Sequence, residues 1–145
     1  MEKNFDVIVI GSGPAGYVCA IRCSQLGLKT ACVESNQTLG GTCLNVGCIP
    51  SKSLLNLSEE FHKVKNLSNK GIEVGEVKLN LNKMMKSKDK AVTVLTKGVE
   101  FLLKKNKVDY IKGKGSLLNE NKVSIINEDG RKNIIESKNI VISTG

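Results

Sequence analysis

Short continuous apolar runs and runs at helical spacing alternate through the first third of this chain. Residues 5–10 form a nearly continuous apolar run that stops at a glycine, which is typical of a buried parallel strand. Small and apolar residues then recur at steps of three and four over residues 14–26, and Gly27 ends the predicted helix. Residues 30–33 are rich in β-forming side chains. This succession of strand, glycine turn, helix and strand predicts a βαβ unit with a right-handed crossover.

Helical spacing and short strand-like runs divide the rest of the chain. The apolar spacing predicts a helix through residues 54–64, which a polar stretch at 66–71 interrupts, and a long helix over residues 81–105. Runs separated by Gly, Asn and Asp then predict a meander of hairpins. These runs are residues 108–111, 116–118, 122–126 and 132–135. Residues 139–143 predict one more buried strand. The whole pattern predicts an α/β fold, a Rossmann-like domain with an inserted helical segment and a small β-meander.

Length and hydropathy add limits to this picture. With 145 residues and 40% apolar content, the chain has material for one core, so we expect a single unit over residues 1–145. The longest apolar runs have the length of strands, and we expect no membrane span. The first predicted strand begins about five residues after Met1, so we expect no leader peptide. The last predicted strand runs directly into Thr144 and Gly145, so we expect a fragment that ends inside an incomplete domain.

The net charge of +8 raises the question of nucleic-acid binding. Ten lysines lie between residues 83 and 114, but they alternate with apolar residues at helical spacing and no arginine lies among them. The chain also has no tryptophan to stack on bases. A solvated helix face is therefore the better interpretation. Three of the five cysteines, Cys19, Cys23 and Cys32, fall in predicted core elements, which favours a reducing compartment.

Residues 11–16 read Gly-Ser-Gly-Pro-Ala-Gly and lie between a predicted strand and a predicted helix. This is the setting of a dinucleotide-binding turn. Gly11 permits the tight turn, Gly13 permits close approach of a diphosphate, and Gly16 permits close packing of helix on strand. Glu34 ends the second strand, where a carboxylate accepts ribose hydroxyls and repels a 2′-phosphate, so NADP is disfavoured. The turn itself fits both FAD and NAD.

Cys43 and Cys48 are separated by four residues and flanked by glycines, so they can close a small disulfide ring. We interpret them as a working redox pair, with the thiolate favoured by a helix start within residues 46–52. Lys52 follows Cys48 by one helical turn and shares its face. Thiols that pass two electrons need an acceptor in contact, which favours a flavin. Zinc is disfavoured, because the other cysteines and His62 lie in other elements, and we predict no metal site.

The chain resembles the N-terminal FAD-binding part of the pyridine nucleotide-disulfide oxidoreductases. The resemblance lies in residues 6–11, 40–52 and 142–145. Within that family, Leu44, Ile49 and Ser51 resemble the dihydrolipoamide dehydrogenases, and so does the segment 97–108. The resemblance implies a flavoenzyme that oxidises protein-bound dihydrolipoyl groups of the 2-oxoacid dehydrogenase and glycine cleavage complexes. Electrons would pass through Cys43 and Cys48 and FAD to NAD.

Roles for single residues also follow from this resemblance. Cys43 would exchange with the substrate dithiol, Cys48 would lie against the flavin, and Lys52 would lie near the reactive flavin nitrogen. Glu34 would bind the adenosine ribose, and Gly115 would lie near the adenine. The residues implied to bind FAD are Gly11, Gly13, Pro14, Ala15, Gly16, Glu34, Ser35, Gly40, Gly41, Thr42, Cys43, Lys52, Gly115, Ser143, Thr144 and Gly145. The closing residues Ser143, Thr144 and Gly145 resemble an Ala-Thr-Gly flavin contact of the family, with Ser143 in place of the alanine.

The family implies parts that this sequence does not contain. The complete protein would be a homodimer with an NAD site outside this chain, in the cytoplasm or, in a eukaryote, in the mitochondrial matrix. We expect no nucleic-acid or membrane partner. We expect these 145 residues alone to be inactive and to bind FAD weakly or not at all. Two alternatives stay open: a mercuric or glutathione type of reductase on the same scaffold, and a non-catalytic FAD-binding redox module.

Overall fold

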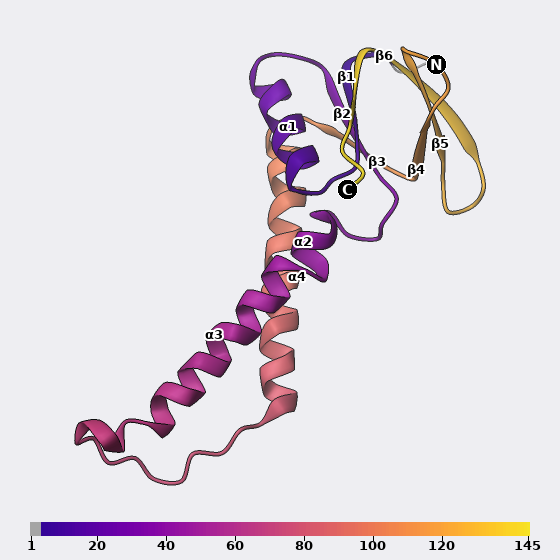
Figure 1. Cartoon of the computed structure of the whole chain (residues 1–145). Helices are drawn as coiled ribbons and strands as arrows, with labels where there is room; N and C mark the ends of the chain where they lie inside the picture. Colours follow the sequence, from indigo (N-terminus) through magenta and orange to yellow (C-terminus); the bar gives the residue numbers. More distant parts are fainter. Residues whose placement is uncertain (1–3) are drawn as a thin grey trace.

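The computed structural model describes residues 4–145, in which helices and strands alternate as in an α/β protein. Figure 1 shows a sheet with α1 beside it and a hairpin of α3 and α4 that projects away from the sheet. The elements are β1 (Asn4–Ile10), α1 (Pro14–Gln25), β2 (Thr30–Glu34), α2 (Gly41–Asn45), α3 (Cys48–Lys65), the 3₁₀ turn η1 (Ser68–Lys70), α4 (Leu81–Lys105), β3 (Asp109–Lys112), β4 (Lys114–Leu117), β5 (Lys122–Ile126) and β6 (Lys132–Ile142).

Within the described residues, the six strands form one sheet in the order β3-β2-β1-β6-β5-β4. The strands β3, β2, β1 and β6 pair in parallel. In contrast, β5 pairs antiparallel with both β6 and β4. The carboxyl ends of β1, β2 and β6 therefore meet at one edge, where ligands bind in open α/β sheets. The prediction of an α/β, Rossmann-like fold is confirmed.

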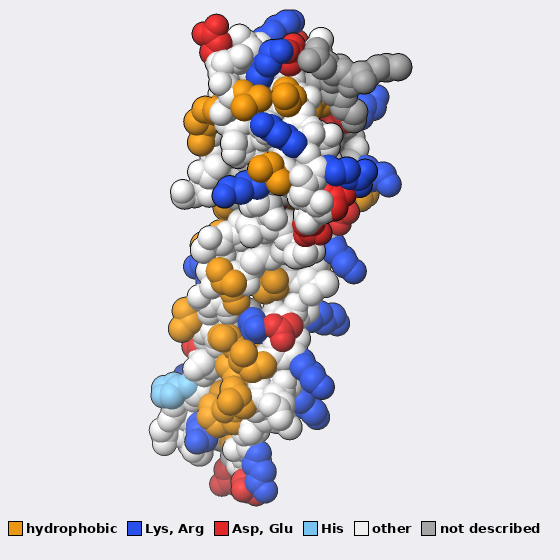
Figure 2. All heavy atoms as spheres, turned by 90° about the vertical axis from the view of Figure 1, so that its right-hand side faces the viewer, with side chains coloured by type: hydrophobic (Ala, Val, Ile, Leu, Met, Phe, Trp, Pro, Cys, Tyr) orange, Lys and Arg blue, Asp and Glu red, His pale blue; other side chains and the backbone are white. Residues whose placement is uncertain are grey.

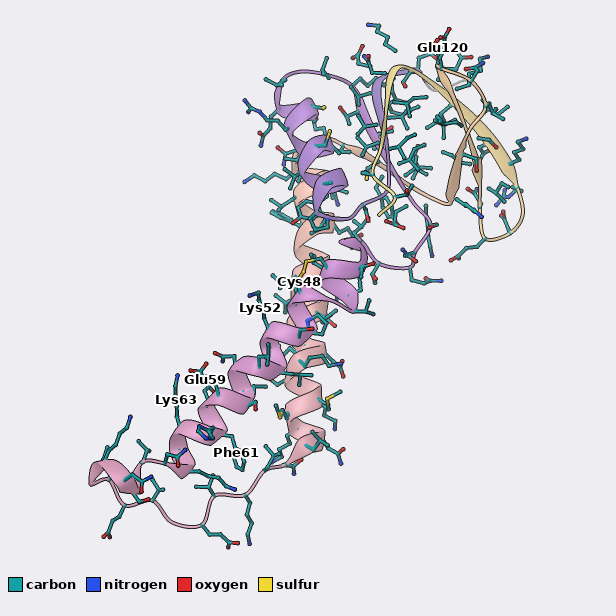
Figure 3. All side chains as sticks on the ribbon, viewed as in Figure 1. Cys48, Lys52, Glu59, Phe61, Lys63 and Glu120 are labelled. Atoms are coloured by element: carbon teal, nitrogen blue, oxygen red, sulfur yellow. A yellow bond between two sulfur atoms is a disulfide. The ribbon has the colours of Figure 1, made fainter. Side chains whose placement is uncertain are left out.

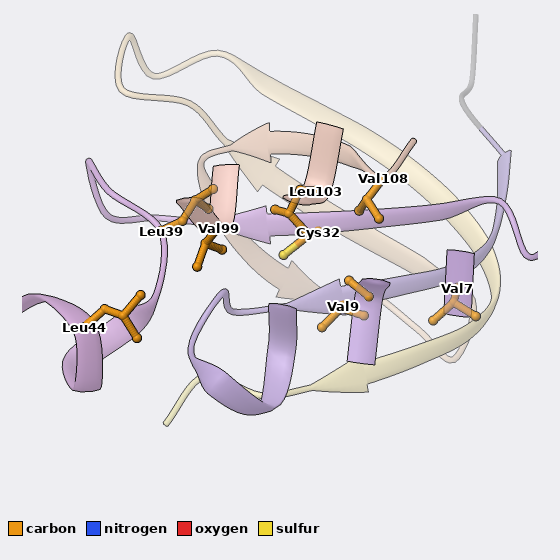
Figure 4. Packing of buried hydrophobic residues seen from close by; sticks show 9 residues of the cluster. Val7, Val9, Cys32, Leu39, Leu44, Val99, Leu103 and Val108 are labelled. Atoms are coloured by element: carbon orange, nitrogen blue, oxygen red, sulfur yellow. The ribbon is translucent and has the colours of Figure 1, made fainter. Parts of the chain in front are cut away.

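The central strand β1 is buried on both faces. Val7 and Val9 pack with Leu103 of α4 in one cluster, part of which appears in Figure 4. Ile8 packs on the other face with Ile125 of β5. Ile8 and Val9 are both 0% exposed. Burial on both faces explains why this strand is a continuous apolar run rather than an alternating one.

The predicted β-meander needs two corrections. First, β3 is not part of it, because β3 pairs in parallel with β2. Second, the strands predicted at residues 132–135 and 139–143 are one strand, β6. The polar residues between them still pair: Glu136 lies opposite both Lys122 of β5 and Asn4 of β1, and Ser137 is buried. The polar residues in the middle of β6 therefore do not end the strand, because they pair with β1 on one side and β5 on the other.

The inserted segment is a helical hairpin. The helix predicted over residues 81–105 has the bounds of α4. The helix α3 starts at Cys48, inside the helix start predicted at residues 46–52, and continues through the predicted 54–64, whereas α2 was not predicted. The buried residues of α4, Thr96, Val99 and Leu103, all lie in its C-terminal half. Val99 and Leu103 pack with core residues of β1 and β2. Figure 2 shows hydrophobic side chains gathered on the lower, helical part of the molecule. No helix within residues 4–145 is long and apolar enough to cross a membrane.

Candidate functional site

The loop after β1 turns tightly against the end of β6. Gly11 has a φ of 103°, a region that favours glycine, and a Cβ there would lie 2.7 Å from the Ser143 carbonyl carbon. The Ser143 amide donates a hydrogen bond to the Ile10 carbonyl over 2.8 Å. Its hydroxyl oxygen lies 3.0 Å from the Ile10 carbonyl oxygen and 3.2 Å from that of Gly11. Ser143 thus ties the end of β6 to the glycine turn.

At the start of α1, Gly16 packs closely against the glycine turn, whereas Gly13 has open space beside it. No side chain caps the first amides of α1, and Gly13 precedes its first residue. A Cβ on Gly16 would lie 2.8 Å from the Gly11 carbonyl carbon and closer still to its oxygen. A Cβ on Gly13 would have the Gly41 Cα, at 4.0 Å, as its nearest neighbour. Gly16 therefore serves packing, whereas Gly13 leaves space beside helix amides, a setting that binds phosphate.

Glu34, at the end of β2, is 5% exposed. Its Oε2 accepts hydrogen bonds from the Ser12 amide at 2.9 Å and the Ser12 hydroxyl at 2.6 Å. Its Oε1 accepts from the Asn36 backbone amide at 2.8 Å and side-chain amide at 3.0 Å. Burial raises the pKa of Glu34, but the hydrogen bonds from Ser12, Asn36 and Ser35 outweigh burial and hold the pKa below its usual value. The site therefore holds a carboxylate at neutral pH.

Cys43 and Cys48 form a disulfide with their Cα atoms 4.7 Å apart. Cys43 lies in the short helix α2, and Cys48 is the first residue of α3. Gly47 lets the two helices meet, because a Cβ there would lie 3.3 Å from the Cys43 Cα. Its amide donates to the Thr42 carbonyl over 2.7 Å. The disulfide fits the redox pair predicted from the spacing of these cysteines.

Asn45, between the two cysteines, holds this loop in shape. Its side-chain amide donates to the Gly41 carbonyl over 2.8 Å and to the Leu39 carbonyl over 3.1 Å. Its side-chain oxygen accepts from the Thr38 hydroxyl over 2.6 Å. The sequence did not single out Asn45, the last residue of α2, because its hydrogen bonds form only once the chain has folded.

The glycine turn, the Glu34 carboxylate and the disulfide border one cavity of about 600 Å³. Most of the predicted cofactor and redox residues lie on its wall. They are Gly11, Gly13, Pro14, Glu34, Ser35, Gly41, Thr42, Cys43, Cys48, Gly115, Ser143, Thr144 and Gly145.

Four predicted residues do not line this cavity: Ala15, Gly16, Gly40 and Lys52. Ala15 is exposed on α1, and Gly16 is buried against the glycine turn. Gly40 is buried behind the wall, where its amide donates to the Ser12 carbonyl over 3.0 Å. Lys52 is exposed on α3, one turn beyond Cys48, as Figure 3 shows.

Sequence reasoning missed part of the wall. The missed residues are Ile10, Ser12, Val33, Asn36, Gly47, Gly113 and Lys114. Ile10 and Val33 could have been predicted from the sequence, because each lies at or near the carboxyl end of a predicted strand, where ligands bind in open α/β sheets. Ser12 lies at a position of the glycine motif that the motif leaves unspecified, so only its contacts reveal it.

Of the remaining thiols, Cys32 lies in the core, and Cys19 and Cys23 are partly buried and pack against it. Cys32 is 0% exposed, and burial raises the pKa of its thiol to about 12. Burial, followed by the neighbouring Cys23, raises the pKa of the Cys19 thiol. Among residues 4–145 there is no group of three or more side chains that could hold a metal ion, and His62 is exposed on α3.

Comparisons with known proteins give a consistent family. A family model described as pyridine nucleotide-disulphide oxidoreductase matches residues 5–145. The chain is 54% identical over 142 residues to a mitochondrial dihydrolipoyl dehydrogenase of Homo sapiens and 55% identical to that of Bos taurus. It is 55% identical over 141 residues to a leghemoglobin reductase of Vigna unguiculata. Each alignment covers 97% of this chain but only 27–28% of the relative.

Proposed function

The chain belongs to the pyridine nucleotide-disulphide oxidoreductase family, and from this premise we propose that it forms the FAD-binding, disulfide-bearing part of a dihydrolipoyl dehydrogenase. One observation carries the proposal. The disulfide of Cys43 and Cys48 borders the same cavity as the glycine turn. A dithiol and a nucleotide cofactor that share one cavity can exchange electrons directly.

The residues of this cavity fit FAD. Its volume of about 600 Å³ lies within the range of ligand sites. Gly13 leaves room for a diphosphate beside the uncapped amides of α1. The Glu34 carboxylate lies on the cavity wall, where it can accept hydrogen bonds from ribose hydroxyls that displace one of its present donors. A side chain at Gly115 would meet Ile10 and Val33 at 3.2 Å, so glycine keeps that part of the wall low, as a flat adenine requires. Bound FAD would supply a two-electron acceptor that can pass electrons on to NAD.

The chain's own contribution is disulfide exchange. We assign the first attack of a dihydrolipoyl thiolate to the Cys43 sulfur, which breaks the bond to Cys48 and releases Cys48 as a thiolate. The second substrate thiol, as a thiolate, then attacks the substrate sulfur joined to Cys43, closes the lipoyl disulfide and frees Cys43. The substrate loses two electrons, the cysteine pair gains two, and the two thiol protons pass to the cysteines or to water.

The order of the two cysteines rests on helix position and on the resemblance. Cys48 is the first residue of the 18-residue helix α3, whose N-terminal partial positive charge stabilises a thiolate. Cys48 is also the more exposed of the two in this chain, so the order does not follow from access. Lys52 belongs to the same proposal as a cation one helical turn beyond Cys48.

The remaining parts of the proposal concern the complete protein. The chain spans about 28% of the length of the curated relatives, so the substrate, the nicotinamide and the partners are inferred from those relatives. We propose dihydrolipoyl domains of 2-oxoacid dehydrogenase and glycine cleavage complexes as the substrate, NAD as the final acceptor, and a homodimer. The mitochondrial location of these relatives supports the mitochondrial matrix for a eukaryotic source, with the cytoplasm as the alternative.

The test uses the protein encoded by the complete reading frame. Purified protein should contain bound FAD and should reduce NAD with dihydrolipoamide as the donor. Cys48→Ser should abolish turnover while FAD stays bound, whereas Cys23→Ser, a matched change outside the cavity, should leave turnover intact. Loss of FAD from the wild type, or turnover in Cys48→Ser, would contradict the proposal. Turnover that requires NADPH with glutathione disulfide or a mercuric ion would favour the alternative reductases.

A further inference from the structure

Ser12 is a fully buried polar residue at the cavity that the proposed function does not use. It is 0% exposed. Its hydroxyl donates to Oε2 of Glu34 over 2.6 Å, and its amide donates to the same oxygen over 2.9 Å. The Gly40 amide lies 3.0 Å from the Ser12 carbonyl oxygen and 3.3 Å from the hydroxyl oxygen. One residue thus joins the glycine turn, the carboxylate and the segment that leads to the disulfide.

The hydrogen bonds of Glu34 divide into a buried side and an exposed side. A carboxylate has about four acceptor positions. Ser12 supplies two donors to Oε2 and Asn36 supplies two to Oε1, where the Ser35 hydroxyl donates as well over 3.4 Å. The donors on Oε2 come from a buried residue, whereas Asn36 and Ser35, which donate to Oε1, are exposed. A ribose hydroxyl can therefore enter at Oε1 by displacing an exposed donor. At Oε2 it would have to displace Ser12 from the core.

We propose that Ser12 is a positioning residue for the adenosine ribose: it holds Glu34 through Oε2 and so leaves Oε1 to accept the ribose hydroxyls. This inference rests on the proposed FAD site. It also gives Asn36 a distinct role, since the Asn36 side-chain amide satisfies Oε1 in the absence of the ribose and moves aside when the ribose binds. Ser12 acts through Glu34 and not on the reacting atoms.

The test measures FAD binding to the apoprotein prepared from the complete protein, by titration calorimetry. Ser12→Ala should raise the dissociation constant about tenfold, because the carboxylate loses a charge-assisted hydrogen bond that orients it. Ser137→Ala is the matched control. Ser137 is also buried, and its hydroxyl donates to the Asn139 carbonyl over 2.7 Å, but it does not line the cavity. It should lower thermal stability to a similar extent and leave the FAD dissociation constant within about twofold.

A double-mutant cycle separates positioning from a general structural role. If Ser12 acts through the carboxylate, the double variant with Glu34→Gln should bind FAD no more weakly than Glu34→Gln alone. Full additivity, or equal effects of Ser12→Ala and Ser137→Ala, would overturn the inference. A wild type that binds no FAD would instead overturn the proposed function itself.

Discussion

Alanine at Gly16 tests the packing of α1 on the glycine turn. Gly16 and Gly98 both lie inside helices, α1 and α4, so alanine at either position gains about 1 kcal/mol of helix propensity. The surroundings differ. A Cβ on Gly98 meets nothing within 4 Å, whereas one on Gly16 lies 2.8 Å from the Gly11 carbonyl carbon and 2.7 Å from the Ser143 hydroxyl oxygen. The pair therefore isolates the cost of the contact from the gain in propensity.

The magnitude follows from these distances. The Gly11 backbone or α1 must move by roughly an ångström, and overpacking of this kind costs about 1–3 kcal/mol or more. After the propensity gain, Gly16→Ala should lose about 2 kcal/mol of unfolding free energy, while Gly98→Ala should gain up to about 1 kcal/mol. For a domain of this size the two variants should differ in melting temperature by roughly 10 °C.

Thermal denaturation followed by circular dichroism measures this difference, and chemical denaturation gives the free energies. The wild type should lie between the two variants. Equal melting temperatures for Gly16→Ala and Gly98→Ala would refute the reasoning, because they would mean that α1 does not rest on the glycine turn at the observed distance.

Three further predictions concern the cavity. The pKa of the folded-state Glu34 lies below its ordinary value of 4.5. The stabilising effect of this carboxylate is therefore present above about pH 4.5 and is lost as the pH falls through the depressed folded value. The free energies of unfolding of the wild type and Glu34→Gln, from chemical denaturation, should differ by about 1.5–3 kcal/mol at pH 7 and converge in acid. Gly13→Ala should keep wild-type stability, because the φ of −63° at Gly13 suits alanine and the added Cβ would lie 4.0 Å from the nearest atom. The same variant should bind FAD more weakly in calorimetry, because the methyl group occupies the space for the diphosphate. Unchanged affinity would mean that no phosphate lies beside Gly13. A Cβ at Gly47 would lie 3.0 Å from the Thr42 carbonyl oxygen and 3.3 Å from the Cys43 Cα. Gly47→Ala should therefore strain the loop by about 1 kcal/mol and make the disulfide several-fold easier to reduce in a dithiothreitol redox titration; an unchanged midpoint would show that the loop accommodates the extra methyl group without strain.

Local patterns were enough to predict the elements that depend on neighbouring residues. The βαβ unit and the helix α4 follow from periodicity, because each buries one face or both faces in a regular way. The continuity of β6 could not be predicted, since Glu136 and Ser137 are polar and only their pairing with β1 and β5 reveals a strand. Parallel pairing of β3 with β2 likewise depends on contacts far apart in the chain.

The candidate site divides in the same way. The glycine turn, Glu34 and the cysteine pair carry sequence signals because their chemistry demands particular residue types at fixed spacing. Ser12, Asn36 and Asn45 do not, since their contributions are hydrogen bonds that appear only once the loops have met. Lys52 is the opposite case, a residue that the sequence predicts for the site but that does not line the cavity in this chain. Helical spacing places it on the face of Cys48 without showing which way that face points.

The most direct test of the central claim is flavin reduction by a dithiol in a single turnover. The complete protein, loaded with FAD, is mixed anaerobically with dihydrolipoamide without NAD, and flavin absorbance is followed. The account predicts that the wild type shows a rapid change in the flavin spectrum and that Cys48→Ser, with the same FAD content, shows none. A flavin that is reduced at the wild-type rate without Cys48 would contradict the claim that the disulfide and the dinucleotide cavity form one redox site.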